Sequence, residues 1–226
     1  MDIMFFILLI ILVILFIFIS LSLFEKDGLK YMYIIYNILS FLLSFKIIEL
    51  ASVDINANIV ISSLFSILTY IIVIKTTKEE YKNLTKQTLW INIIVSLFIL
   101  LTTLYIGTVS DNNAVSIKYL FLDNYKILLT YPIITLINQL VIFLIYNNIK
   151  DLTESVNKNI IIASLTTLML ESLLFNIFSY IFELPFKEII VLILSNYLIK
   201  VLLTIIYIFL VKFLTSKKKV KLWIYY

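Results

Sequence analysis

Two hydrophobic stretches decide the fold class: IIIASLTTLMLESLLFNIFSYIF at residues 160–182 and IIVLILSNYLIKVLLTIIYIFLV at residues 189–211. As a helix, each is long enough to cross the roughly 30 Å hydrocarbon core of a bilayer. Each contains one charged residue near its centre, Glu171 in the first and Lys200 in the second. A charge at this depth costs roughly 2.5–3.5 kcal/mol in an isolated helix, so we expect both side chains to face the interior of a bundle.

Five further stretches are long and apolar enough to span a membrane, which takes about 20 residues each. They are residues 3–24, 31–50, 57–74, 88–106 and 127–149. The first lacks the basic start and the small-residue cleavage site of a secretory signal peptide, so we expect it to be retained as a membrane helix. Because the connections are short, the sequence predicts one all-α domain over residues 1–226, a polytopic membrane helical bundle.

The composition supports this class and excludes several others. Hydrophobic residues make up 62% and charged residues 14% of the chain, whereas a soluble domain has nearly half and about a quarter. The chain contains no Cys and no His, and all of its 18 basic residues are Lys. A disulfide framework, the usual zinc sites, haem ligation and Cys or Ser–His nucleophiles are therefore excluded. We expect neither a metal nor a cofactor.

The lysines predict an orientation, because cytoplasmic connections of membrane proteins carry an excess of them. Lysine-rich segments at residues 26–30, 75–86, 150–158 and the tail 212–226 alternate with lysine-poor ones. With seven helices, this alternation places the N-terminus outside the plasma membrane and the basic tail in the cytoplasm. The basic tail is part of this topology signal, and binding of anionic lipid is a second interpretation of it. The lipid bilayer is an expected partner of the chain, and nucleic acid is not.

Polar residues in other stretches lie at the same depth as the two charges. Asn37, Asn138 and Gln139 are each near the middle of a hydrophobic stretch. Helical spacing extends this layer into three faces. These faces are Asn196, Lys200, Thr204 and Tyr207, with Tyr197 beside them; Ser164, Thr167, Glu171 and Phe175; and Tyr131, Thr135, Gln139 and Tyr146.

Such a layer suits a flat, polar small molecule, because amides and carboxylates bind its edge while aromatic rings stack on its faces. The candidate substrate-binding residues are Asn37, Gln139, Glu171, Phe175, Asn196, Tyr197 and Lys200. The alternative is structural: an ion pair that joins the last two helices, with Ser and Thr at the helix contacts.

Several motifs have a family-like spacing. Lys126 is followed by Gln139 and then Lys150, and the segment ASLTTLMLESLLFNIFSYIFELP carries Glu171, Phe175 and Pro185. LILSNYLIKVLL carries a Tyr-x-x-Lys at Tyr197 and Lys200, and YNILSF and KTTKEEYKN occur earlier in the chain. On these motifs, residues 31–210 resemble the queuosine precursor transporter family, also called the vitamin uptake transporters.

The resemblance implies a six-helix core with one extra N-terminal transmembrane helix, and import of a queuosine precursor, a 7-deazaguanine base. It also implies that Glu171 binds the guanidine-like edge of the base while Gln139 and Asn37 bind its carbonyl edge. The family's acidic positions fall here on Tyr70, Ile142 and Tyr207, and its Gly on Thr77. A similar flat heterocycle is therefore the alternative cargo.

Three other function classes share single features with the chain. Asn196-x-x-x-Lys200 has the spacing of the retinal-binding helix of microbial rhodopsins, but the usual Arg and lining Trp residues are missing. Glu79-Glu80 resembles the Glu pair of CAAX-type membrane proteases, which also need Arg and His, so we expect no enzymatic activity.

The third class is a substrate-binding membrane subunit of an ATP-driven vitamin importer. The chain has no G-x-x-x-x-G-K-[ST] motif, so ATP hydrolysis would require separate ATPase subunits as partners. A homo-oligomer is the other expected assembly.

Overall fold

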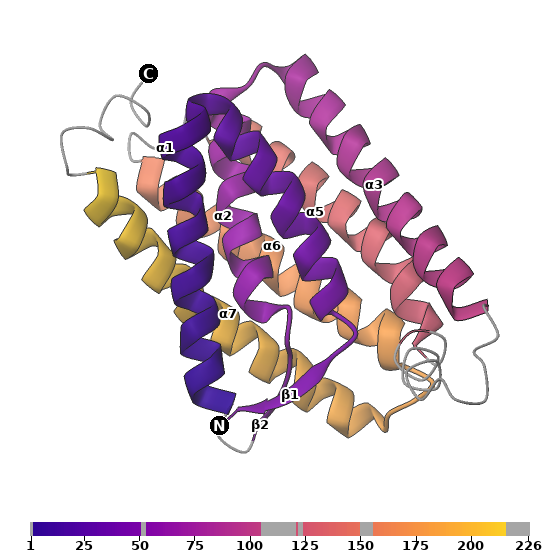
Figure 1. The fold of residues 1–226 in the computed structure, drawn as a ribbon. Coiled ribbons are helices and arrows are strands. Elements are labelled where there is room, and N and C mark those ends of the chain that lie inside the picture. The colour runs from indigo at the N-terminus through magenta and orange to yellow at the C-terminus, as the bar shows by residue number, and fades with distance from the viewer. Residues whose placement is uncertain (1, 51–52, 105–120, 122–123, 150–155, 216–226) are drawn as a thin grey trace.

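The structure, a computed structural model, describes residues 2–50, 53–104, 121, 124–149 and 156–215. Within these ranges it consists of helices and one two-stranded sheet (Figure 1). The elements are α1 (Asp2–Leu43), β1 (Ile47–Leu50), β2 (Val53–Asn56), α2 (Ile59–Lys75), α3 (Lys78–Leu104), α5 (Tyr125–Ile149), α6 (Val156–Tyr180) and α7 (Phe186–Thr215).

Four helices are long and apolar enough to cross a membrane: Lys78–Thr103, Tyr125–Ile149, Lys158–Tyr180 and Phe186–Phe209. Two apolar helices, Phe6–Ile17 and Ile59–Lys75, are shorter. The expected helical class is thus confirmed, with four helices that could span a membrane, whereas the division into a six-helix core and one added helix stays a prediction. The basic tail from residue 216 onward lies outside the described residues.

Helix α1 contains the first expected stretch and most of the second, and it folds back on itself (Figure 1). The Tyr36 hydroxyl donates a hydrogen bond to the carbonyl of Val13, although these residues would be about 35 Å apart along a straight helix. Near this bend of α1, the Ser20 hydroxyl donates a hydrogen bond to the Gly28 carbonyl at 3.1 Å. A Cβ atom on Gly28 would overlap the carbonyl oxygen of Ser20, so this close approach requires glycine.

The expected helix 31–50 ends early, at Leu43, and its last residues form β1. Strand β1 pairs antiparallel with β2, so that Ile48 lies opposite Ile55 and Glu49 opposite Asp54. The helical prediction for residues 47–50 is therefore wrong. The β-branched Ile47 and Ile48 suit an extended strand, and hydropathy alone does not distinguish the end of an apolar helix from a short apolar strand.

Helix α3 also differs from its expected bounds, since it begins at Lys78 instead of residue 88. Its start is a capping box. The Glu80 N–H donates to the Thr77 hydroxyl at 3.2 Å, and the Thr77 N–H donates to the Glu80 carboxylate at 2.9 Å. Glu80 thus caps the start of a helix.

The bundle exposes apolar side chains on its outer faces and buries polar side chains together with a hydrophobic core. Helix α2 lies at its centre, with nearly every residue buried, and contacts α1, α5, α6 and α7. On α7, Leu194, Leu198 and Leu202 expose 55–61% of their surface, whereas the polar face that includes Asn196 and Lys200 is buried. Apolar outer faces and small polar residues between helices fit a bundle surrounded by lipid.

The close contact at the fold of α1 gives a test. Gly28→Ala is expected to destabilise the protein by about 1–3 kcal/mol, because the added methyl group meets a backbone oxygen that cannot move without shifting a helix arm. Thermal unfolding in detergent measures this loss. Asp27→Ala is the control, since it removes only an exposed 3.5 Å ion pair with Lys30; equal unfolding temperatures for the two variants would contradict the close approach.

Candidate functional site

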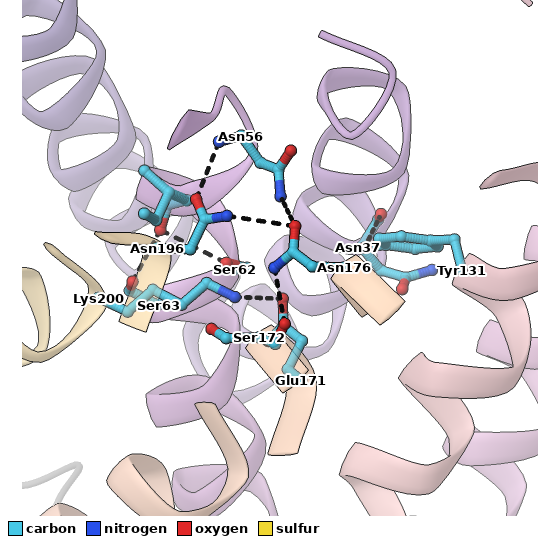
Figure 2. A network of polar contacts seen from close by, with 11 residues as sticks. Asn37, Asn56, Ser62, Ser63, Tyr131, Glu171, Ser172, Asn176, Asn196 and Lys200 are labelled. Atoms are coloured by element: carbon cyan, nitrogen blue, oxygen red, sulfur yellow. Dashed lines mark hydrogen bonds and ion pairs between the residues drawn. The ribbon is translucent and has the colours of Figure 1, made fainter. Parts of the chain in front are cut away.

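The lone charges of α6 and α7 meet inside the bundle. The Lys200 ammonium donates to a Glu171 carboxylate oxygen at 2.9 Å (Figure 2). Glu171 is 8% exposed and Lys200 3% exposed, so the expected interior position of both charges is confirmed. Because each charge would be costly alone in this surrounding, the pair holds α6 and α7 in one register.

A small cavity lies next to this pair. It is lined by Ser40, Ser62, Phe65, Tyr131, Ile134, Thr135, Asn138, Glu171 and Phe175. Its volume of about 10 Å³ suffices for about one water molecule. The lining therefore combines aromatic rings with polar groups from α1, α2, α5 and α6, but it is closed around a very small space.

The lining is rich in hydrogen-bond acceptors. An ionised Glu171 carboxylate only accepts hydrogen bonds, and so does the amide oxygen of Asn138. The Asn138 amide oxygen is buried and has no hydrogen-bond partner within the part of the chain that the structure describes. A buried acceptor without a partner costs about 1–3 kcal/mol, so the cavity favours a ligand that carries N–H or O–H donors.

Two predicted site residues, Asn37 and Gln139, bind α3 instead of lining the cavity. The Asn37 side-chain amide donates to the Asn92 amide oxygen at 2.6 Å. The Gln139 amide donates to the Thr88 hydroxyl at 2.9 Å, and its backbone carbonyl accepts from the Tyr81 hydroxyl at 2.8 Å. These contacts attach α3 to α1 and α5.

A third predicted residue, Asn196, belongs to a cluster of three buried amides that we call the amide cluster: Asn56, Asn176 and Asn196. The Asn196 oxygen accepts from the Asn56 backbone N–H at 2.9 Å. The Asn176 oxygen accepts from the side-chain amides of Asn56 at 3.0 Å and Asn196 at 3.3 Å. The cluster joins β2, α6 and α7 above the ion pair, with Asn37 and Tyr131 to one side (Figure 2).

The last two predicted residues differ in position. Phe175 is buried and lines the cavity. Tyr197 is only partly buried and is not part of the cavity lining. The structure thus groups Glu171, Phe175 and Lys200 at one place, brings Asn196 close above them, and separates Asn37, Gln139 and Tyr197 from them.

Several polar residues of this interior are not among the predicted site residues. Asn176 has a detectable signal, because Ser172, Asn176 and Ser179 follow helical spacing on α6 and are all buried. Asn138 is adjacent to Gln139 and lies near the middle of the same stretch, but the family spacing favours its neighbour. Asn56 carries no signal, since it lies in a segment expected to be a loop.

No protein-family model, no curated protein and no solved structure matches this chain. The resemblance to queuosine precursor transporters therefore stays a prediction. In the described ranges, no three Asp or Glu residues gather so that they could hold a metal ion.

The ion pair gives the second test. Glu171→Gln and Lys200→Met are each expected to destabilise the protein by about 3–5 kcal/mol, because each leaves the other charge buried alone. The double variant is expected to recover most of this loss, and thermal unfolding of all four proteins in detergent measures the coupling.

The surface pair Lys126–Glu183, at a similar distance of 2.8 Å but 20% and 34% exposed, serves as the control. Lys126→Met is expected to cost at most about 1 kcal/mol. Additive losses in the Glu171→Gln/Lys200→Met double variant would show that the two charges do not interact.

Proposed function

We propose that this chain is a small-molecule membrane transporter whose substrate binds beside the Glu171–Lys200 ion pair. One observation carries the proposal: the buried, paired carboxylate lines a cavity in which the Asn138 amide oxygen has no partner among the described residues. Ionisable groups within membrane helices typically mark substrate or ion pathways.

The chemistry of the lining suggests the substrate class. Two acceptors, the Glu171 carboxylate and the Asn138 amide oxygen, match a molecular edge with several N–H donors, as in a guanidine-like group. Tyr131 and Phe175 supply ring faces for a flat heterocycle. A 7-deazaguanine base, the cargo implied by the family resemblance, has both features, and import of such a base is the specific form of the proposal.

The size of the cavity means that the site must widen to bind. A heterocyclic base is several times larger than the water-sized space beside Glu171. In this proposal, the substrate's N–H donors bind Glu171 in part where Lys200 now does, and Lys200 binds the carboxylate again between transport cycles. Lys200 is then the partner of the Glu171 carboxylate when no substrate is bound.

We propose an orientation in the plasma membrane with the N-terminus outside and the basic tail in the cytoplasm. The lysine distribution supports it. The start of α1 and the end of α7 also lie at opposite ends of the bundle (Figure 1), as an odd number of crossings requires.

Uptake of radiolabelled 7-deazaguanine bases into vesicles that contain the purified protein is the third test. Glu171→Gln and Asn138→Ala are each expected to lower uptake by about tenfold or more, because each removes an acceptor for the N–H edge. Glu183→Gln is the matched control, since its carboxylate forms an ion pair outside the cavity, and it is expected to retain uptake. Wild-type rates in both site variants would contradict the proposal.

The same vesicles distinguish the alternative function. Binding of the base without uptake by the protein alone, and uptake only after addition of ATPase subunits that copurify with it, would favour the substrate-binding subunit of an ATP-driven importer. Absence of binding across a panel of deazapurines and vitamins would contradict both the independent transporter and the substrate-binding subunit.

A further inference from the structure

The β1–β2 hairpin covers the end of the bundle nearest the ion pair. Ile55 is fully buried in the hydrophobic core, and the Ser195 hydroxyl donates to the Asp54 carbonyl at 3.0 Å. Asn56 at the end of β2 supplies a backbone N–H and a side-chain amide to the amide cluster. All of these polar contacts with α6 and α7 are hydrogen bonds between neutral groups.

A groove lies on the outer side of this hairpin, between it and the start of α7. It is lined by Ile47, Val53, Asp54, Leu184, Lys187, Glu188, Val191 and Leu192. Its volume of about 410 Å³ is in the range of small-molecule sites. Its lining combines apolar side chains with two carboxylates, those of Asp54 and Glu188, and one ammonium, that of Lys187.

One face of α7 connects the groove with the ion pair. Glu188, Leu192, Asn196 and Lys200 are spaced four residues apart, so they follow one another along one side of the helix. Glu188 and Leu192 line the groove, Asn196 binds Asn56, and Lys200 binds Glu171. The distance along the helix is about 18 Å, and the amide cluster lies in between.

We infer that the paired strands β1 (Ile47–Leu50) and β2 (Val53–Asn56) are a gate for the substrate, that the amide cluster is its latch, and that the groove is the outer vestibule where the substrate docks first. The inference rests on the proposed transport function. Opening breaks the contacts of Asn56 with Asn176, Asn196 and the Tyr180 hydroxyl, all of them between neutral groups, and joins the vestibule to the cavity beside Glu171. Neutral amide hydrogen bonds suit a latch, because water or the substrate replaces them at little net cost.

A single reporter thiol tests the gate without any substrate. The chain has no Cys, and Ser62 lines the cavity below the latch, so Ser62→Cys introduces the sole thiol. A membrane-impermeant methanethiosulfonate, added to sealed vesicles on the hairpin side, reacts with it only when the gate opens. Adding Asn196→Ala is expected to raise the reaction rate about tenfold, because Asn56 loses one of its two amide partners.

Asn92→Ala in the same Ser62→Cys background is the matched control. It removes an equally buried amide, which pairs with Asn37 and is not part of the amide cluster, so the reaction rate is expected to stay unchanged. Equal rates for Asn196→Ala and the Ser62→Cys parent, or an equal rise in the Asn92→Ala control, would overturn the gate.

Uptake by the wild-type protein separates this inference from the proposed function. If Asn196→Ala raises the reaction rate of the Ser62→Cys thiol but the wild-type protein takes up no base, the gate stands and the cargo assignment fails. If the wild-type protein takes up a base but Asn196→Ala leaves the reaction rate of the thiol unchanged, transport stands and the gate fails.

Discussion

Polar groups in this bundle must find their partners inside it, because the outer helix faces consist of exposed Leu, Ile and Phe side chains. Lipid offers no hydrogen bonds, so each buried amide, hydroxyl or charge fixes the rotation of the helix that carries it. Lys200 and Glu171 set α7 against α6. The Asn37–Asn92 contact sets α1 against α3 in the same way, at the opposite side of the interior.

The polar side chains of the interior form two groups, which differ in how completely their hydrogen bonds are satisfied. On the side of α3, Asn37 pairs with Asn92 and Gln139 pairs with Thr88 through side-chain hydrogen bonds. On the side of α6 and α7, the paired Glu171 borders a cavity in which the Asn138 oxygen has no partner among the described residues. The first arrangement is that of structural contacts between helices, and the second is that of a site which a donor-carrying ligand completes.

The sequence predicted the features for which a wrong placement in lipid would cost much free energy and for which a single helix carries the signal. A charge near the centre of an apolar stretch is too expensive to face lipid, so the interior position of Glu171 and Lys200 follows from the sequence alone, and the structure shows that they pair. Helical spacing likewise predicted the buried faces of α6 and α7. The helix lengths followed from the bilayer thickness, and α5, α6 and α7 agree with their expected ranges to within a few residues.

The sequence did not predict features set by long-range geometry. The choice of partner for Gln139 depends on how far α3 approaches α5, which no local pattern encodes. The hairpin at Ile47–Asn56 could not be distinguished because its apolar residues continue the hydropathy of the preceding helix. Family spacing pointed to Gln139 for the site, whereas the adjacent Asn138 faces the cavity, since neighbouring residues on a helix point in directions about 100° apart.

The contrast between the ion pair and the amide cluster agrees with a division of roles in a transporter. The charged pair is costly to separate, so its partner must be replaced by a group of comparable hydrogen-bonding strength, which restricts what can bind Glu171. The amides of Asn56, Asn176 and Asn196 are neutral, and separating them costs less. A barrier that opens for passage requires weak contacts such as those of the amide cluster. A site that selects its ligand requires a strong contact such as the ion pair. From the groove inward along α7, the amide cluster comes first and the ion pair second.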